Sequence, residues 1–206
     1  MADIFFVSAI FFGAYLMGCL PTGYMFGKAA GVDLTRQGSG STGFTNIFRI
    51  AGVRWAFAAL FTDFLKGAGV AYIGKQFFTS DLFILSLILT VALGNIFSVF
   101  LKFRGGKGVA VISGGIAVLA WNPILILLVV SFWAFILLWK RIMSLANLAV
   151  FLFAVPVYLL VFYESWIWYG AGFGIFIFLL FTHRGNVGRL IRGEEKKFIF
   201  KNTKTR

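Results

Sequence analysis

Long apolar runs alternate with short polar or glycine-rich stretches along most of this chain. Each run is long enough to form a helix, and together they cover about residues 4–27, 55–73, 82–101, 108–121, 123–139, 144–162 and 166–183. A helix that crosses the hydrocarbon core of a bilayer needs about 20 residues, so the fourth and fifth runs are short. The pattern predicts an all-α, polytopic membrane protein with seven transmembrane helices, two of them short.

The two short runs leave one alternative open. Pro123 follows Asn122 between them, and proline interrupts a helix because it lacks an N–H group. In this alternative, residues 108–139 form a re-entrant pair and the chain has five full spans.

Composition agrees with a membrane protein. Hydrophobic residues make up 60% of the chain and charged residues 13%, whereas soluble domains have about 25% charged residues. The net charge of +12 would suit a nucleic-acid-binding protein. However, most of the excess lies in short loops and in the tail 184–206, where membrane orientation and attraction to anionic lipid explain it. We therefore expect membrane lipid, and no nucleic acid, as a partner.

The distribution of Lys and Arg predicts the orientation. If the N-terminus is outside and all seven runs cross, every one of the 19 Lys and Arg residues except Lys66 and Lys75 lies on the cytoplasmic side or in the C-terminal tail. This asymmetry follows the positive-inside rule, and it predicts an N-out/C-in topology. Charge alone does not exclude the five-span version, because Lys140 and Arg141 lie on the same face in both.

No repeat or linker is visible, so we predict a single domain over residues 1–206.

Two glycine-rich stretches between the apolar runs are candidates for chemistry. Glycine has no side chain to shield its backbone N–H group. Glycine N–H groups next to Lys or Arg are therefore suited to bind an anion such as phosphate. In lipid, such irregular backbone persists only if it is buried in protein or lines a water-filled cavity. We predict phosphate-binding roles for Ser39, Gly40, Thr45, Asn46, Arg49, Gly105, Gly106, Lys107 and Gly108. The structural alternatives are helix caps for Ser39 and Thr45 and an orienting cation for Lys107.

Familiar nucleotide and metal motifs are excluded. The spacing Gly38-x-Gly40-x-x-Gly43 fits a dinucleotide fingerprint, but that motif requires a preceding strand. Gly106-Lys107 lacks the Ser or Thr that follows in a P-loop. The sequence contains one Cys, Cys19, and one His, so it has no Cys/His metal cluster. We expect no metal and no organic cofactor.

Two further polar groups interrupt the apolar pattern. His183, Asn186 and Arg189 follow one another at spacings of three at the inner end of the last run, which places them on one helical face. His183 is the one side chain suited to act as a base near neutral pH, although an interfacial anchor is the simpler role. Asp63 and Lys66 lie near mid-span, where an ion pair offsets desolvation and where charges are often functional.

Four segments together resemble the bacterial acyl-phosphate-dependent glycerol-3-phosphate acyltransferases. They are Gly38 to Arg49, Asp63-Phe64-Leu65-Lys66-Gly67, Phe103 to Ala110, and His183-Arg184-Gly185-Asn186 with Arg189. The resemblance covers nearly the whole chain in the right order. It implies a seven-helix enzyme of the bacterial inner membrane that works at the cytoplasmic face. Such an enzyme transfers a fatty acyl group from acyl phosphate to the 1-hydroxyl of glycerol 3-phosphate, giving lysophosphatidic acid and phosphate in the first step of phospholipid synthesis.

The chemistry of an acyl phosphate favours binding over nucleophile activation. It is a mixed anhydride that is already activated, so the protein must mainly hold two anionic substrates and neutralise phosphate. We predict catalytic roles for Lys107, His183 and Asn186, and substrate binding by Arg189. The resemblance implies that the donor's own phosphate accepts the hydroxyl proton; otherwise His183 is the base.

Four positions depart from the family pattern. Family members commonly have Asn, His, Thr and Ser where this chain has Ser41, Asn95, Val111 and Asn147, so we assign no essential role to these residues.

The rival hypothesis is a transporter of an anionic solute. Transporters favour midplane sites and internal repeats, whereas here the predicted polar set lies at one face and no repeat is present.

Overall fold

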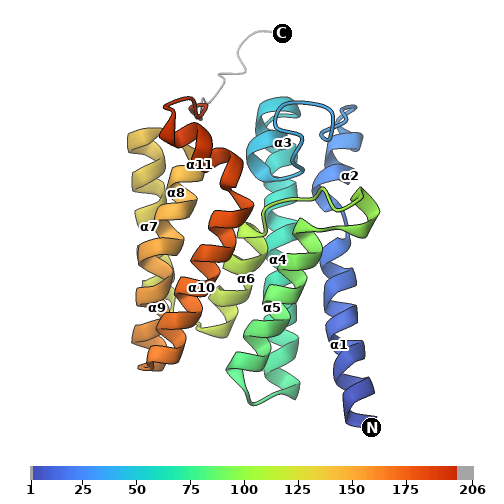
Figure 1. Ribbon diagram of the computed structural model, residues 1–206, viewed down its shortest axis with the longest axis vertical. Coiled ribbons are helices and arrows are strands. Elements are labelled where there is room, and N and C mark those ends of the chain that lie inside the picture. The colour runs from blue at the N-terminus through green and yellow to red at the C-terminus, as the bar shows by residue number, and fades with distance from the viewer. Residues whose placement is uncertain (1, 199–206) are drawn as a thin grey trace. The chain divides into compact units, whose positions relative to one another are not determined.

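The computed structural model describes residues 2–198, apart from the side chains of Ala2, Asp3 and Phe162. The described residues form helices and connecting loops and contain no strand (Figure 1), which confirms the all-α prediction. The chain divides into two compact units, residues 1–121 and 122–206. The end of the predicted cytoplasmic tail, 199–206, lies outside the described residues.

The first unit is built around one long helix, α4 (Val53–Phe77). Around it in chain order are α1 (Ala2–Cys19), α2 (Thr22–Ala29), α3 (Phe44–Ile50), α5 (Asp81–Ile96), the 3₁₀ turn η1 (Val99–Leu101) and α6 (Val109–Leu119). Helices α2, α3, α5 and α6 all pack against α4. In Figure 1 the loop between α2 and α3 lies at the opposite end of this unit from the N-terminus of α1.

Helices α4 and α6 approach each other closely because glycines lie at their contact. A Cβ atom at Gly67 would collide with the backbone of Val111, and one at Gly114 would collide with the backbone of Phe64. Close contact through small residues is a common way to associate helices in membranes, because lipid gives no hydrophobic drive between them. Val111 is completely buried here, so an apolar residue in place of the family's usual Thr fits its surroundings.

The second unit contains α7 (Pro123–Lys140), α8 (Met143–Ala149), a π-helical turn η2 (Val150–Ala154), α9 (Val155–Tyr163), α10 (Trp166–Thr182) and α11 (Arg184–Ile191). Asn122 begins α7 by accepting hydrogen bonds from the N–H groups of Ile124 and Leu125, both at 3.1 Å. Pro123 follows at the first helical position, where its missing N–H costs nothing. The Asn122-Pro123 break is therefore a helix start.

All seven predicted runs contain helix, and the number of crossings stays a prediction. Within the described part of the chain, five helices are long and apolar enough to cross a bilayer, and a sixth span results if α10 and α11, bent by 76°, count as one. Helix α6 has 11 residues, too few for a full crossing. The first run proved to be broken, because α1 ends at Cys19 and α2 begins at Thr22.

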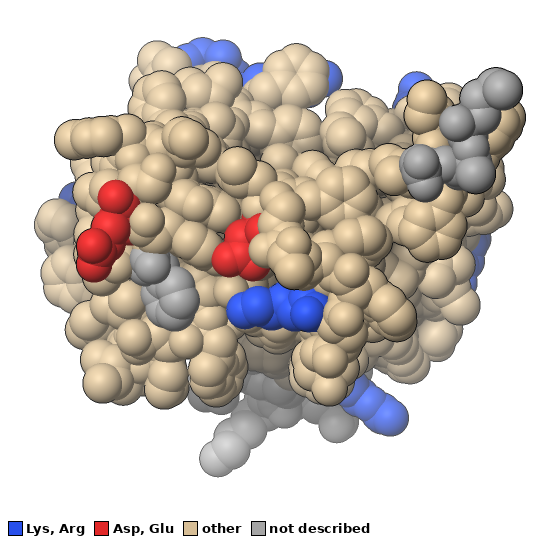
Figure 2. Space-filling view, turned by 90° about the horizontal axis from the view of Figure 1, so that it is seen from below, with Lys and Arg blue, Asp and Glu red and all other residues tan. Residues whose placement is uncertain are grey.

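Large apolar side chains cover much of the outside of both units. Phe5 is 76% exposed, Leu127 65% and Trp166 80%. Such surfaces are stable only when lipid or protein covers them. In the view of Figure 2, Lys, Arg, Asp and Glu side chains are few among the other residues. The fold is therefore that of an integral membrane protein.

Candidate functional site

The loop between α2 and α3, residues 30–43, is held by Asn46. Its Nδ2 atom donates to the carbonyl oxygens of Leu34, Gln37 and Ser41 at 3.3, 3.1 and 2.9 Å. Its Oδ1 atom accepts from the N–H of Ser39 at 3.0 Å. Asn46 is 2% exposed, so its polar atoms are used to hold the loop. This geometry corrects its predicted role from contacting phosphate to shaping the loop that would do so.

The other predicted residues of this segment surround Asn46. Ser39 and Arg49 are exposed, and Thr45 is half-buried in the first turn of α3. Gly40 has a φ of +73°, a left-handed conformation that strains most other residues. The Oγ atom of Ser41 accepts from the N–H of Gly43 at 3.2 Å, so Ser41 also takes part in shaping the loop.

Asp33 ties the start of this loop to α2. Its carboxylate accepts from the N–H and hydroxyl of Thr35 at 3.1 and 2.6 Å and pairs with Lys28 Nζ at 3.2 Å. The hydrogen bond from the Thr35 hydroxyl, followed by that from Lys28, lowers the pKa of Asp33 below its ordinary value. Asp33 is therefore ionised at neutral pH and keeps the loop attached to the end of α2.

The second glycine-rich stretch differs from the predicted cradle. The N–H groups of Gly105 and Gly106 donate to the carbonyl oxygens of Ile96 and Asn95 at 2.9 and 3.0 Å. The amides of these two glycines hold the loop against the end of α5, which corrects the prediction that they face phosphate. Glycine is needed at 105 because a Cβ there would collide with the carbonyl of Asn95.

Gly108 and Lys107 stand at the start of α6. Gly108 has a φ of +77° and is the residue before the helix, and no described side chain caps it. The first N–H groups of a helix have no partner within the helix and carry partial positive charge. Lys107 directly precedes Gly108 in the chain. The binding of phosphate by Lys107 and Gly108 stays a prediction.

Predicted residues of the second unit meet at a carboxylate that the sequence analysis missed. Glu195 Oε1 accepts from Asn186 Nδ2 at 2.6 Å and from Ser144 Oγ at 3.0 Å, and its Oε2 pairs with Arg189 Nε at 2.7 Å. The Glu195 side chain is 6% exposed. The cluster ties the segment after α11 to α11 itself and to α8. One signal was present, since Glu194 and Glu195 are the only acidic residues in a basic tail.

His183 lies at the bend between α10 and α11. It is 1% exposed, and its Nδ1 atom is 2.9 Å from the carbonyl oxygen of Leu179. Because a carbonyl oxygen only accepts, we assign the proton to Nδ1, and Nε2 is then the nitrogen that can gain or lose a proton. Thr182 Oγ1 also donates to Leu179 O, at 2.9 Å. Asn147, the last of the departures, accepts from Trp133 Nε1 at 2.8 Å.

Comparison with known proteins identifies the family. The family model described as glycerol-3-phosphate acyltransferase matches residues 8–193. A relative from Aquifex aeolicus with that name is 36% identical, over 90% of this chain and 95% of its own length. One from Shewanella halifaxensis is 36% identical, over 94% of this chain and 96% of its own length.

Two solved structures share the fold. Both are of PlsY (YgiH), an integral membrane glycerol 3-phosphate acyltransferase. The glycerol 3-phosphate form aligns with a TM-score of 0.83 and 32% identity, over 94% of this chain and 96% of that one. The lysophosphatidic acid form gives a TM-score of 0.81 and 31% identity, over 93% of this chain and 94% of that one. This chain belongs to the glycerol-3-phosphate acyltransferase family and is a multi-pass bacterial membrane protein.

The Glu195 cluster predicts a pH-dependent stability. Burial raises the pKa of Glu195, but hydrogen bonds from Asn186, Arg189 and Ser144 outweigh it, and the pKa is lowered overall. A carboxyl whose pKa is lower in the folded state stabilises the fold above its unfolded pKa, about 4.3, and loses that contribution as the pH falls. Thermal unfolding of purified protein should show wild type losing more stability than Glu195→Gln between about pH 5 and 3.

The matched control for this prediction is Glu194→Gln. Glu194 pairs with Arg192 at 2.8 Å, but its side chain is 58% exposed, so its charge is screened by water. At pH 7, Glu195→Gln should lower the unfolding temperature clearly, because each hydrogen bond to a charged group contributes about 1.5–3 kcal/mol. Equal behaviour of the two variants would show that the cluster does not stabilise the second unit.

Proposed function

We propose that this protein transfers a fatty acyl group from acyl phosphate to the 1-hydroxyl of glycerol 3-phosphate, releasing phosphate and lysophosphatidic acid. The observation that carries the proposal is the match to glycerol-3-phosphate acyltransferases over nearly the whole chain, including a solved glycerol 3-phosphate form and a lysophosphatidic acid form. The described residues offer cations and helix N–H groups suited to phosphate, at Arg49 and at Lys107 with the start of α6.

The reaction needs no strong nucleophile from the protein. The glycerol 3-phosphate oxygen attacks the acyl carbonyl carbon, the bond from that carbon to the phosphate oxygen breaks, and the hydroxyl proton leaves with phosphate. In this proposal Lys107 stabilises negative charge on phosphate as the bond breaks. Ser39, Gly40, Thr45, Arg49, Gly108 and Arg189 hold the two anionic substrates. Asn46, Gly105 and Gly106 support the loops that carry these groups.

Lys107→Ala should lower the rate of lysophosphatidic acid formation by at least about a hundredfold, the usual effect of losing a group that stabilises transition-state charge. The assay supplies acyl phosphate and glycerol 3-phosphate to purified protein in detergent and measures phosphate and lysophosphatidic acid. Lys102→Gln, which removes an exposed cation from the same connection, is the control and should keep near-normal turnover. Equal activity of the two variants would refute the assignment of Lys107. Absence of product from wild type would favour the transporter.

We propose that His183 orients glycerol 3-phosphate, while the departing phosphate accepts the proton. The amide introduced by His183→Gln keeps an N–H group for the Leu179 carbonyl, so that variant should retain measurable turnover, whereas His183→Ala should lose much more. Thr182→Val, which removes the other donor to Leu179 O, controls for disturbance of the helix end. If instead both His183 variants are inactive and the wild-type rate rises with pH around 6.5, the ordinary pKa of histidine, then His183 is the base.

We further propose that the protein lies in the inner membrane as one seven-span domain, N-out/C-in, with the reaction at the cytoplasmic face. The distribution of Lys and Arg supports this orientation.

Labelling of introduced cysteines tests this topology. Cys19 is completely buried, so only the introduced cysteine should react with a maleimide. In spheroplasts, an impermeant maleimide should label Thr79→Cys, in the connection between α4 and α5, and label Lys102→Cys only after the membrane is opened. The reverse pattern would invert the topology.

A further inference from the structure

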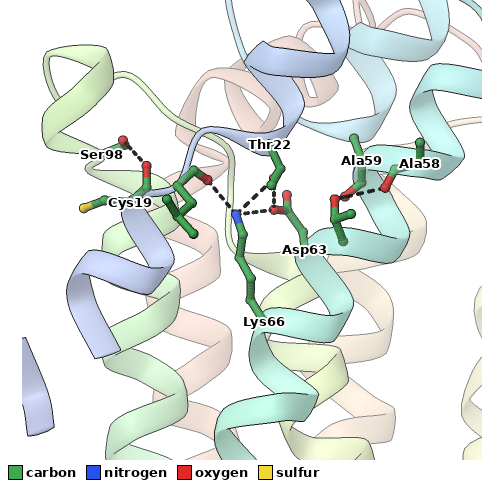
Figure 3. Close-up of polar contacts among 9 residues, drawn as sticks. Cys19, Thr22, Ala58, Ala59, Asp63, Lys66 and Ser98 are labelled. Carbon is green, nitrogen blue, oxygen red and sulfur yellow. Dashed lines mark hydrogen bonds and ion pairs between the residues drawn. The ribbon is translucent and has the colours of Figure 1, made fainter. Parts of the chain in front are cut away.

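The first membrane span is broken, and the break exposes backbone carbonyl groups (Figure 3). Helix α1 ends at Cys19, and Pro21 precedes α2. In hydrocarbon, a carbonyl group without a donor costs several kcal/mol, so a break needs partners from elsewhere in the protein. The Cys19 carbonyl accepts from Ser98 Oγ at 2.6 Å. The Leu20 carbonyl accepts from Lys66 Nζ at 2.7 Å, in addition to the N–H of Thr22 at 2.9 Å.

Lys66 and Asp63 of α4 form a polar clamp with Leu20 and Thr22. Lys66 Nζ lies 2.8 Å from Asp63 Oδ1 and 3.0 Å from Thr22 Oγ1, in addition to its bond with Leu20 O. Thr22 Oγ1 in turn donates to Asp63 Oδ1 at 2.7 Å. The Lys66 and Asp63 side chains are 7% and 12% exposed. The two charged side chains therefore contact residues at the break as well as each other.

The two charges contact both sides of the break. The Lys66 ammonium bonds the Leu20 carbonyl after the end of α1 and the Thr22 hydroxyl at the start of α2. The Asp63 carboxylate accepts from the same Thr22 hydroxyl. An ion pair that served α4 alone would not require contacts with both α1 and α2.

The clamp also lies between two contacts that α4 makes with candidate phosphate-binding segments. Ala56 and Ala59 of α4 pack in one cluster with Ile47 of α3. Further along α4, Gly67 packs against the backbone of Val111 in α6. Asp63 and Lys66 lie between these contacts in the sequence of α4. Through Thr22 they fix the start of α2, which leads into the loop 30–43.

We propose that Asp63 and Lys66 are positioning residues for the reaction. They lock the helix break to α4 and thereby set the position of α2 and of the loop 30–43, which carries Ser39 and Gly40. The claim about substrate binding rests on the proposed function, whereas the claim about the loop does not. The two claims are therefore tested by separate measurements.

The loop is tested first, without any assay of activity. Arg36 is exposed in the loop, so trypsin cleavage after Arg36, followed by mass spectrometry of protein in detergent, reports how often the loop opens. Lys66→Met should make this cleavage about tenfold faster, because cleavage follows the population of the open form. Lys75→Met is the matched control: Lys75 is also on α4 and donates to a backbone carbonyl, that of Leu119, at 2.8 Å, but it lies away from the break. It should leave cleavage after Arg36 unchanged.

Kinetics then separate positioning from stability. Lys66→Met should raise the KM for glycerol 3-phosphate by about tenfold or more while changing kcat less, since misplaced binding groups weaken substrate binding. Lys66→Arg, which keeps the charge and donor groups, should recover part of that loss. Lys75→Met should lower the unfolding temperature without a change in KM. Wild type without acyl transfer would overturn the proposed function but leave the proteolysis result valid.

Milder variants cover the case in which Lys66→Met does not fold. Thr22→Val removes only the hydroxyl that joins the break to Asp63, and Asp63→Asn with Lys66→Met removes both charges together. Each should speed cleavage after Arg36 and raise KM, and the double variant should fold better than Asp63→Asn alone, because removal of one partner leaves a buried charge unpaired. If all these variants lose only thermal stability, with cleavage and KM as in Lys75→Met, the pair is structural and the proposal is wrong.

Discussion

The lipid environment requires every backbone group exposed by a break in a helix to find a partner inside the protein. This chain breaks or bends its helices at Leu20-Pro21, at the turn after α5 and at His183, and in each case a specific donor or acceptor is present. Lys66 and Ser98 bond to the first break. The N–H groups of Gly105 and Gly106 bond to the end of α5. His183 and Thr182 contact the Leu179 carbonyl at the bend. The hydrogen bonds at these three places follow from this one requirement.

The same requirement explains why the loops of the candidate site are held by hydrogen bonds among their own residues. Asn46 holds four backbone groups of the first loop, and Asp33 fastens the loop to α2. Side chains that project away from this internal bonding are the ones suited to a ligand, and the exposed side chain of Ser39 is of this kind. Many polar residues that resemble ligand contacts in the sequence are therefore supports, and fewer remain to touch substrate.

The sequence predicted much of the fold because apolar runs in a membrane protein are long and their ends are marked by charge. All seven runs contain helix, although the first is broken at residues 20–21. The break in the first run was missed because the run was judged by its hydropathy, although Pro21 was visible. Glu195 was missed because its place among basic residues does not show which side chains it contacts, and one partner, Ser144, lies 51 residues away. The amides of Gly105 and Gly106 were misassigned because spacing shows that a loop is flexible enough to bind, but does not show which carbonyls already occupy its N–H groups.

The position of Glu195 also affects how the chain is made. Ser144, Asn186 and Arg189 are all synthesised before their shared acceptor. Until Glu195 leaves the ribosome, α8 and α11 lack the carboxylate that joins them. In chain order, the contacts that join α8 to α11 through this carboxylate are therefore the last of the described polar contacts of the second unit to become possible.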